Sequence, residues 1–451
     1  MAERLIVIGG TAAGLSAASR ARKGDPKLEI LVFEKSGYAS YGSCGLPYFV
    51  GGLIDAPEDL LAMSVGDLET KRGISVRLHQ EATNIDREKK QVTVRDLTEG
   101  TECVYSYDKL VLATGAVPLM PQIPGIRSKG VYPLRNVEDG IALKHAASGR
   151  KRAVIIGGGF IGLEIAEELT LSGNTVSVYE QLPTLLPFLD ASFSEMVKAE
   201  LKMHGVKLHT GVGIAEILQE DGRACGVRTS SGEGEAADFV LVSIGVRPET
   251  ALAQKAGLSL GIKGGIAVDD EMHTADPDIW ACGDCVQMKN RITGAPAYVP
   301  LGTTANKQGR IAGANAAGGH ETFPGVLGSM VTKVFDLYIA ATGLSLKQAE
   351  EAGYQAVSSV IAKQDRASYY PGGRENHLCL ILDQKTGRLL GAQGAGSESV
   401  AGRINVFATA ITCGMTVGEI NELDLVYAPP VAPVYDPILI AASQAMKKVM
   451  G

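Results

Sequence analysis

The chain is short of aromatic residues, of long apolar runs and of any excess of positive charge. Phe, Trp and Tyr make up only 5% of its 451 residues, while glycine occurs 55 times, which favours strand–helix–strand units with tight turns over an all-β or coiled-coil protein. Lys and Arg number 43 against 50 Asp and Glu, so the net charge of −7 gives no reason to expect nucleic acid as a partner. No apolar run reaches the roughly 18 residues that a membrane span requires.

Cysteines are few and scattered. An odd number, seven, spread along the chain is not a disulfide framework. The sequence also opens on a strand-like segment in place of a signal peptide. We therefore expect a cytoplasmic protein without membrane association, whose thiols are mostly reduced and structural.

A glycine-rich turn joins a strand and a helix near the start of the chain. Residues 5–8 (LIVI) are apolar, and GGTAAG follows at 9–14 with Thr11 in place of the usual middle glycine. Glycines here let backbone N–H groups and the helix dipole face a pyrophosphate. Glu34 ends a second apolar run, twenty residues after Gly14, where its carboxylate reaches a ribose diol. Together these elements predict a dinucleotide site, although a glycine turn alone is also compatible with no ligand.

A near copy of this unit begins at Arg152. Residues 153–156 are apolar, GGGFIG at 157–162 completes the G-x-G-x-x-G pattern, and Glu180 ends the next strand. Glu180 repels a 2′-phosphate and no arginine follows it directly, so this second site is predicted to prefer NADH, with NADPH as the alternative. Phe160 has two interpretations, a gate over the nicotinamide or a core aromatic.

Three further apolar strands end in turns. KLVLATG (109–115) and FVLVSIG (239–245) are each followed by a proline-containing turn, where the chain is expected to cross between nucleotide domains. TADPDIWACGD (274–284) ends in Asp284, predicted to be exposed and placed for the ribityl chain of a flavin. The C-x-x-C at 282–285 is interpreted as structural because no second cysteine pair lies nearby, and no metal site is predicted.

The segment YASYGSCGLPYFVGG (38–52) holds a single cysteine among small residues. Pro47 is tolerated in the first turn of a helix, and the positive end of that helix is expected to favour the Cys44 thiolate over the thiol. Cys44 is therefore the candidate redox nucleophile. The alternative is an inert buried cysteine, since free cysteine is among the most buried residue types.

Toward its C-terminus the chain has a different sequence pattern. Residues 300–317 are predicted to form an amphipathic helix with Asn306 and Arg310 on its polar side. An α+β domain is expected to follow. The prolines of 423–437 forbid helix and hold Tyr427 on an ordered loop. The strands and the helix predicted in this domain lie at 331–342, 378–382, 388–394 and 404–413.

The chain resembles the two-dinucleotide-binding flavoprotein disulfide reductases. The resemblance rests on the combination of the two nucleotide turns, the ATG strand, the strand ending in Gly-Asp and the cysteine. Phe49 stands five positions after Cys44, so the C-x-x-x-x-C pair of glutathione reductase and lipoamide dehydrogenase is absent. S-x-x-x-C-G-x-P-Y at 40–48 is similar to the branch of coenzyme A disulfide reductases and NADH-dependent persulfide reductases. YYPG at 369–372 and YAPP at 427–430 match that branch too.

This resemblance implies an α/β fold with two Rossmann-like dinucleotide-binding domains and a C-terminal α+β dimerisation domain. The implied ranges are 1–114 with 245–322 for FAD, 115–244 for NAD(P)H and 323–451 for dimerisation. The implied cofactors are FAD and NADH. Their binding residues would be Gly9, Ala13, Gly14, Glu34, Lys35, Thr114, Gly115, Gly157, Gly159, Phe160, Gly162, Glu180, Gly245, Asp284 and Leu301.

The resemblance also implies how one cysteine suffices, because the thiol of CoA takes the part of the second. Cys44 would rest as a mixed disulfide with CoA and reduce a CoA disulfide, persulfide or polysulfide in an NAD(P)H-dependent reaction. Tyr369 and Tyr427 are the implied acids for the leaving thiolate, with core or interface packing as the alternative. In a homodimer Tyr427 would reach the flavin of the partner subunit. The implied CoA-binding residues are Arg20, Lys23, Ser40, Ser43, Lys71 and Asn306, although a basic helix face is also typical of simple solvation.

Other functions stay open. The related NADH oxidases and peroxidases place a histidine in the first glycine turn, where this chain has Thr-Ala-Ala at 11–13. A flavin-dependent electron-transfer reductase for a protein partner and a slow redox sensor are further alternatives. After Tyr427 the chain has VAPVY at 431–435 where the family has a Ser-rich stretch and a lysine, so free polysulfide or another small persulfide competes with CoA as the substrate.

Overall fold

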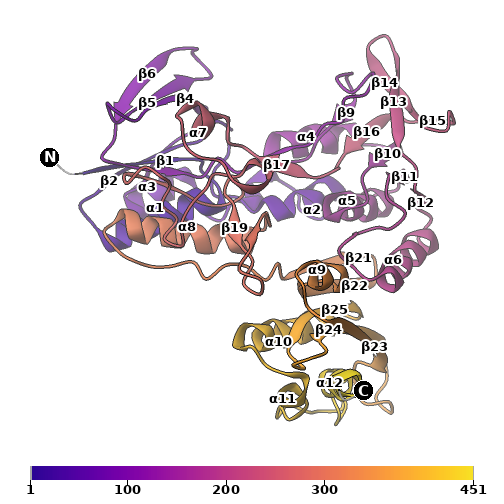
Figure 1. The fold of residues 1–451 in the computed structure, drawn as a ribbon. Coiled ribbons are helices and arrows are strands. Elements are labelled where there is room, and N and C mark those ends of the chain that lie inside the picture. The colour runs from indigo at the N-terminus through magenta and orange to yellow at the C-terminus, as the bar shows by residue number, and fades with distance from the viewer. Residues whose placement is uncertain (1–2, 450–451) are drawn as a thin grey trace.

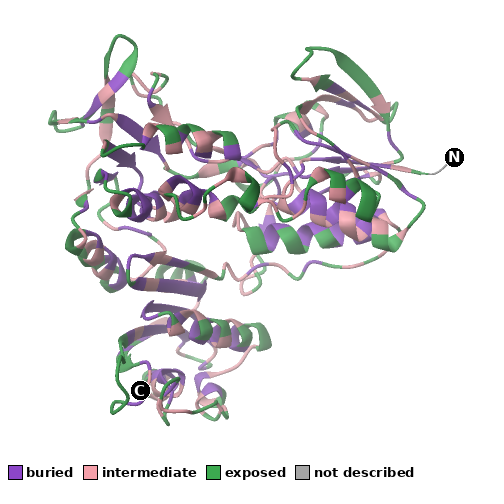
Figure 2. Ribbon diagram, turned by 180° about the vertical axis from the view of Figure 1, so that it is seen from behind, coloured by how far each residue is buried: buried purple, intermediate pink, exposed green. Residues whose placement is uncertain are grey.

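Figure 1 shows two α/β units side by side and a third, C-terminal unit below them. The computed structural model describes residues 3–449, so the outermost two residues at each end of the predicted domain ranges lie outside it. Buried residues are concentrated in the sheets and on the inner faces of the helices (Figure 2). None of the helices within 3–449 is long and apolar enough to cross a membrane.

The first unit is a parallel sheet with strand order β18-β7-β1-β2-β3. Its central strands are continuous apolar runs because helices and loops cover both faces. Strand β18 comes from a distant stretch of the chain, so two separated segments build this unit. Its main elements are β1 (Arg4–Ile8), α1 (Ala12–Gly24), β2 (Glu29–Phe33), β3 (Ser75–Arg77), β7 (Lys109–Leu112), β18 (Ile279–Ala281) and α8 (Gly302–Ala316).

Helices α1 and α8 lie against each other (Figure 1), and two glycines of α8 allow the close approach. A Cβ atom at Gly309 would lie 2.2 Å from the carbonyl oxygen of Ala13, and one at Gly313 would lie 2.1 Å from that of Ala17. Only glycine fits at such distances. Helix α8 confirms the helix predicted at 300–317.

Smaller elements surround the first sheet. A separate antiparallel sheet is formed by β4, β5 and β6, and short helices carry the cysteine segment and the later pair Lys71 and Arg72. These elements are α2 (Leu46–Gly51), α3 (Val65–Arg72), β4 (Gln80–Asp86), β5 (Gln91–Asp96), β6 (Glu102–Ser106), α7 (Ala251–Lys255), β19 (Met288–Lys289), β20 (Pro296–Ala297) and the 3₁₀ turns Ser43–Gly45, Pro57–Leu60 and Ile262–Gly264.

The second unit repeats the first, with strand order β12-β11-β10-β16-β9 and an added antiparallel sheet of β13, β14 and β15. As predicted, its glycine turn follows β10 and leads into α5. The elements are β9 (Val131–Tyr132), α4 (Val137–Ala146), β10 (Arg152–Ile156), α5 (Phe160–Leu171), β11 (Thr175–Glu180), α6 (Ala191–Met203), β12 (Lys207–Thr210), β13 (Ile214–Glu220), β14 (Arg223–Thr229), β15 (Gly234–Ala236) and β16 (Phe239–Val242).

Two short strands connect the units. β8 (Ala116–Pro118) and β17 (Val246–Pro248) pair antiparallel, one leaving the first sheet and the other returning from the second. Gly115 and Gly245 precede them with φ of +73° and +110°, values that glycine adopts without strain. The chain thus crosses at the two turns that the sequence indicated.

The third unit is an antiparallel sheet with strand order β21-β22-β25-β24-β23, covered by α10 and α12. The prediction of one strand-like run over 331–342 was incomplete, because a tight turn at Phe335, with φ of +50°, divides it into a hairpin. The proline-rich segment before α12 has no helix, as expected. The elements are β21 (Met330–Val334), β22 (Leu337–Gly343), α9 (Leu346–Glu351), β23 (Ala356–Gln364), β24 (Glu375–Asp383), β25 (Leu389–Gly396), α10 (Ser399–Cys413), α11 (Val417–Asn421) and α12 (Pro437–Val449).

Candidate active site

The first glycine turn brings the start of α1 tightly against the sheet. Gly9 has a φ of +109°, and a Cβ atom there would lie 2.2 Å from the carbonyl oxygen of Ala113. A Cβ atom at Gly14 would lie 1.9 Å from the carbonyl oxygen of Gly9. The Thr11 side chain makes no capping hydrogen bond, so the first N–H groups of α1 are left for an anion.

Glu34 lies at the end of β2, beside this turn. Its carboxylate accepts hydrogen bonds from the N–H groups of Gly10 at 2.7 Å and Ser36 at 2.9 Å. The structure therefore brings the predicted acid and the glycine turn together. Lys35 is exposed next to it, and its role as a cofactor contact stays a prediction.

The second glycine turn has the same construction. Gly157 has a φ of +112°, and a Cβ atom there would lie 2.5 Å from the carbonyl oxygen of Ser243. A Cβ atom at Gly162 would lie 2.1 Å from the Gly157 carbonyl oxygen. Helix α5 begins after Gly159, again without a side-chain cap. Phe160 packs against Phe188 with ring centroids 5.5 Å apart, which accords with the core interpretation, while the gate stays a prediction.

Glu180 at the end of β11 is the counterpart of Glu34. Its carboxylate accepts from the N–H groups of Gly158 at 2.7 Å and Leu182 at 2.8 Å. Lys198 donates to the Pro183 carbonyl oxygen at 2.7 Å. The loop thus presents a negative charge where a 2′-phosphate would sit.

The remaining predicted cofactor residues have structural contacts of their own. The Thr114 hydroxyl donates to the Glu249 carbonyl oxygen at 2.5 Å and so fastens the connection between the units. The Ala13 side chain packs against Gly283, and a Cβ atom added to Gly283 would lie 2.7 Å from the Cβ atom of Ala13. Leu301 directly precedes α8. Contacts of these three residues with a cofactor stay predictions.

Asp284 is half-buried, not exposed as the sequence analysis expected. Its carboxylate accepts from the Arg135 guanidinium at 3.0 Å, and only 15% of its side chain is accessible. Tyr298 donates to its carbonyl oxygen at 2.9 Å. The side chain of Gln308 also holds this turn, accepting from the Gly283 N–H at 2.9 Å. Sequence reasoning missed Arg135 because it lies in a loop of another unit with no motif around it.

Cys44 lies in a 3₁₀ turn that leads into α2. Its surface is accessible, and no other cysteine is paired with it. Helix α2 is held on α5, since a Cβ atom at Gly51 would lie 2.1 Å from a carboxylate oxygen of Glu168. Lys144 of α4 caps the other side, 4.1 Å from the centre of the Phe49 ring. The turn that presents the thiol is therefore wedged between two helices of the second unit.

The surroundings of Cys44 do not favour the thiolate, contrary to the expectation from the helix start. Desolvation raises the pKa of the thiol above its ordinary value, and the carboxylates of Glu164 and Asp284 raise it further. Arg135 and the Ser43 hydroxyl act in the opposite direction. Helix α2 is only six residues long, so its positive end is weak compared with the nearby acids.

Glu164 is a second residue that sequence reasoning missed. It follows the second glycine turn on α5 and accepts from the Thr332 hydroxyl of β21 at 3.1 Å. Burial, with Glu167 and Glu168 nearby, raises the pKa of its carboxyl to about 6. Its position two residues after Gly162 was the only signal in the sequence.

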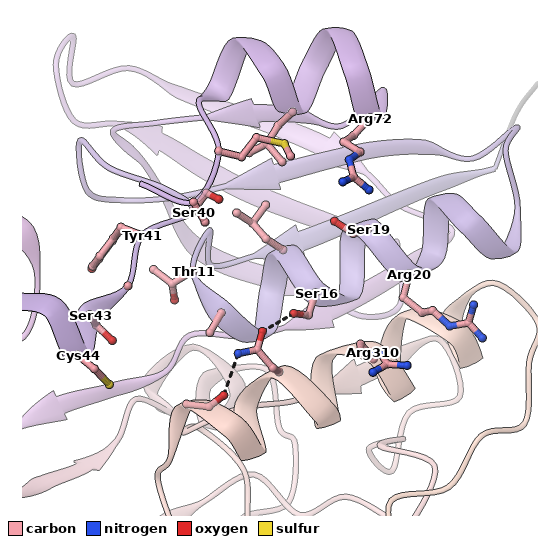
Figure 3. Close-up of a pocket in the computed structure, with 18 of the residues that line it drawn as sticks. Thr11, Ser16, Ser19, Arg20, Ser40, Tyr41, Ser43, Cys44, Arg72 and Arg310 are labelled. Atoms are coloured by element: carbon pink, nitrogen blue, oxygen red, sulfur yellow. Dashed lines mark hydrogen bonds between the residues drawn. The ribbon is translucent and has the colours of Figure 1, made fainter. Parts of the chain in front are cut away.

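A surface groove of about 600 Å³ runs from Cys44 along α1 and α8. Ser43 and Cys44 lie at one end, and three arginines lie toward the other (Figure 3). Five of the six predicted CoA residues line this groove, as the resemblance implies, and further polar or charged side chains line it with them. The predicted residues that line it are Arg20, Lys23, Ser40, Ser43 and Asn306, and the additional ones include Ser16, Ser19, Tyr41, Arg72 and Arg310.

Lys71 does not line the groove. It pairs with Asp67 at 2.9 Å on the exposed side of α3, with 67% of its side chain accessible. Arg72, the next residue, points into the groove instead (Figure 3). Adjacent residues on a helix point about 100° apart around its axis, so Arg72 faces the groove while Lys71 faces away from it.

Two of the groove side chains are already engaged by the protein. Asn306 accepts from the Ser16 hydroxyl at 2.7 Å and donates to the Gly302 carbonyl oxygen at 3.0 Å. The Arg20 guanidinium forms an ion pair with Glu321, which the side chain of Asn315 holds through its backbone N–H at 2.7 Å. Any anion that binds Arg20 must therefore compete with Glu321.

Tyr369 and Tyr427 lie together in the third unit, and neither lines the groove. Their hydroxyl oxygens are 3.0 Å apart, and both rings are exposed. This hydrogen bond raises the pKa of the Tyr427 phenol. Within one chain the structure thus brings the two tyrosines to each other but not to Cys44.

The C-x-x-C cysteines are buried side by side in the first unit. The Cys285 thiol donates to the Cys282 carbonyl oxygen at 3.3 Å, and neither side chain is accessible. Burial raises the pKa of both thiols. Their contacts accord with the structural interpretation.

Comparison with known families decides what this arrangement is. Residues 3–317 match the family described as pyridine nucleotide-disulphide oxidoreductase, and residues 330–436 match the dimerisation domain of that family. The chain belongs to the pyridine nucleotide-disulphide oxidoreductases. The predicted fold, two Rossmann-like units followed by a dimerisation domain, is confirmed.

Individual relatives of this oxidoreductase carry two kinds of name. The NAD(P)H coenzyme A polysulfide/persulfide reductase of Pyrococcus horikoshii is 37% identical over 98% of each chain. The NADH oxidase of Methanocaldococcus jannaschii is also 37% identical, over 99% of each chain. Among solved structures, the NAD-dependent persulfide reductase from A. fulgidus is 40% identical, with a TM-score of 0.96 over 99% of this chain and 83% of that one.

Membership of the pyridine nucleotide-disulphide oxidoreductases implies a flavin and a nicotinamide nucleotide, and the residues of this oxidoreductase fit both. Each glycine turn is a cradle that a Cβ atom would fill, and each following helix starts without a side-chain cap. Within residues 3–449, the Gln308 side-chain nitrogen is buried without a hydrogen-bond partner beside the Gly283 turn. Uncapped helix starts suit the pyrophosphates of the two dinucleotides.

Proposed function

We propose that this oxidoreductase uses NADH to reduce disulfides, persulfides or polysulfides of CoA or a closely similar thiol at Cys44. The groove that leads from the Cys44 thiol to a group of cations carries this proposal (Figure 3). CoA combines a thiol at one end with phosphates at the other, and the groove offers the matching groups at its two ends. The names of the Pyrococcus horikoshii and A. fulgidus relatives support the same substrate class.

The chemistry follows from one sulfur and its neighbours. The bound flavin supplies transfer of an electron pair from the nicotinamide to sulfur. Cys44 attacks a substrate sulfur as the thiolate, its bond to that sulfur forms, and the substrate S–S bond breaks. The leaving thiolate then takes a proton. Over one turnover NADH and one proton convert a disulfide into two thiols, or a persulfide into a thiol and hydrogen sulfide.

Glu164 and Arg135 are suited to control the charge at Cys44. Glu164, with a pKa of about 6, holds a proton over part of the neutral range. Arg135 stabilises the thiolate and is itself fixed by Asp284 at 3.0 Å. We infer that these residues set the protonation of Cys44, and that the thiolate is not simply the product of a helix start.

The neighbouring pair Lys71 and Arg72 provides the test of CoA binding. Arg72→Ala is expected to raise KM for CoA disulfide or CoA persulfide by about tenfold, since it removes one charge-assisted contact with phosphate. Lys71→Ala removes the same charge from the outer side of α3 and is expected to leave KM within about twofold. Steady-state assays with the CoA substrate and with inorganic polysulfide distinguish a phosphate contact from a general defect.

Inorganic polysulfide has no phosphate, so its turnover should be the same in both variants. Equal KM values for Arg72→Ala and wild type with CoA substrates would contradict CoA as the occupant of the groove. An equal loss with both substrates would show that Arg72 acts on the fold instead.

We infer that the active unit is a homodimer, with the tyrosine pair of one chain facing Cys44 of the other. The dimerisation-domain match and the exposed apolar side chains beside Tyr427 support this arrangement. In the loop before α12, Val426 is 85% exposed and Val434 is 64% exposed, so this loop offers apolar surface to a partner. The hydrogen bond between the Tyr427 and Tyr369 hydroxyls raises the pKa of the Tyr427 phenol, so the phenol keeps its proton, which suits a donor to a leaving thiolate.

Mixing two inactive variants tests this geometry. Tyr427→Phe is expected to lower turnover of disulfide substrates by about 100-fold, since it removes a general acid. A Cys44→Ser chain re-associated with a Tyr427→Phe chain should regain about a quarter of wild-type activity, because half of the dimers then hold one intact site. No recovery in verified heterodimers would place the tyrosines in the site of their own chain.

NADH oxidation by oxygen is the second candidate, favoured by the Methanocaldococcus jannaschii relative. The first glycine turn offers Thr11 and two alanines where a histidine would be needed, which argues for the sulfur reaction. Comparing NADH consumption with oxygen and with a CoA disulfide separates the two.

All seven cysteines are free, which supports a reducing compartment, and we place the enzyme in the cytoplasm.

A further inference from the structure

We propose a divalent metal site, of a kind suited to Zn²⁺, at the junction between the second and third units. Glu200 and His204 lie one turn apart on α6 and its C-terminal end, and Asp336 lies in the turn between β21 and β22. The ligand atoms of the three side chains all lie within 4.8 Å of one another. The site is remote from the groove and is not part of the oxidoreductase reaction.

The imidazole is the clearest sign of a missing partner. The His204 Nε2 atom is buried and has no hydrogen-bond partner among the described residues. It lies 3.4 Å from a carboxylate oxygen of Glu200, without the alignment of a hydrogen bond. A buried ring nitrogen left unpaired carries a cost in free energy that a bound ligand removes.

The distance between the ligand atoms of His204 and Glu200 also suits the coordination of zinc. Zinc takes nitrogen and carboxylate oxygen ligands at about 2.0–2.2 Å, so two ligands of a tetrahedral ion lie about 3.4 Å apart. The Nε2–oxygen distance between His204 and Glu200 has this value. Asp336 is exposed on a turn, so its side chain can rotate inward to supply a third ligand, with water as the fourth.

Neighbouring groups hold the His204 ring, the Glu200 carboxylate and the backbone of Asp336 before any ion binds. The His204 ring stacks on the Phe335 ring, with centroids 3.9 Å apart and planes inclined by 2°. The Asp336 N–H donates to Glu200 at 2.9 Å, and the Arg374 guanidinium donates to the Asp336 carbonyl oxygen at 2.7 Å. Arg374 therefore holds the backbone of the turn and not its carboxylate. Preorganised ligands of this kind lower the cost of binding.

The charges favour a divalent cation over a proton alone. Two carboxylates meet one imidazole, and Lys333 of the adjacent strand β21 is already paired with Glu167. A 2+ ion would neutralise both carboxylates, whereas one proton on His204 would neutralise only one of them. A bound ion would also join α6 to the β21–β22 turn, so metal binding should stabilise the junction of the two units.

The test is zinc binding to the flavin-loaded enzyme in a Cys44→Ser background, which removes the accessible active-site thiol as a competing ligand. Titration calorimetry after chelator treatment is expected to show one Zn²⁺ per chain, with a rise in Tm that grows with free zinc. His204→Phe keeps the ring stacked on Phe335 but removes both nitrogens. This variant is expected to bind zinc about 100-fold more weakly, because loss of a group that only supports a ligand already lowers metal affinity by up to that factor.

His320→Ala is the matched control, because His320 also lies 3.4 Å from a carboxylate, that of Glu271, but belongs to no three-ligand group in the part of the chain that the structure describes. This variant should bind zinc like the parent. Equal binding by the His204→Phe variant and its parent would overturn the proposal. A Tm that rises on acidification without metal, and does not respond to zinc, would also overturn it and identify a protonated-histidine contact instead.

Discussion

Replacing Cys44 by serine is expected to lower turnover of CoA disulfide, persulfide and polysulfide by about 10³-fold or more, since a residue that acts as part of a catalytic unit cannot be compensated by the others. Reduction of the bound flavin by NADH should continue at close to the wild-type rate, because the second glycine turn and Glu180 are untouched. Anaerobic stopped-flow at the flavin absorption band measures that first half-reaction, and thiol release measures the second.

Cys413→Ser is the control for this result, since Cys413 is also free and exposed but lies at the end of α10 in the third unit. It should retain full activity. If the Cys44→Ser variant still passed electrons rapidly to a protein acceptor, the enzyme would be an electron-transfer reductase. Unchanged disulfide turnover in Cys44→Ser would remove the basis of the proposed function.

The second large effect concerns the nicotinamide nucleotide. Glu180→Ala combined with Gln181→Arg is expected to shift the ratio of kcat/KM for NADPH over NADH by about 100-fold in favour of NADPH. The change removes the negative charge at the end of β11 and adds a guanidinium that can form a bidentate pair of hydrogen bonds with a 2′-phosphate. Steady-state kinetics with both nucleotides provide the measurement.

Glu180→Gln separates charge from geometry in this prediction. The amide oxygen can still accept from the Gly158 N–H, which now donates to Glu180 at 2.7 Å, so the turn keeps its shape. NADPH use should improve part of the way while NADH use changes little. A double variant that still prefers NADH by the wild-type ratio would show that another part of the second unit selects the nucleotide.

Features set by neighbours in sequence were predicted well. Strand, glycine turn, helix and acid follow one another within about 30 residues in a dinucleotide-binding unit, so the motif alone placed Glu34 and Glu180 beside their turns. The cysteine segment was also found correctly as the start of a short helix. In these cases backbone geometry over a few residues decides the outcome.

Features set by distant residues were not predicted. The pKa of Cys44 depends on Glu164, Asp284 and Arg135, which reach it from three separate parts of the chain. Asp284 was expected to be exposed, but Arg135 covers its carboxylate. Lys71 is a different case, because one position on a helix changes the direction of a side chain and the sequence around α3 did not show whether Lys71 or Arg72 faced the groove.

Helix α5 links the two half-reactions mechanically. Its first residues close the second glycine turn, the predicted nicotinamide nucleotide site, and its later turns support helix α2, which follows the Cys44 turn, through the close packing of Glu168 on Gly51. The helix acts as a spacer of fixed length between hydride donor and thiol. Inserting one residue near its middle would turn every later residue of the helix by about 100° around the axis and break that alignment.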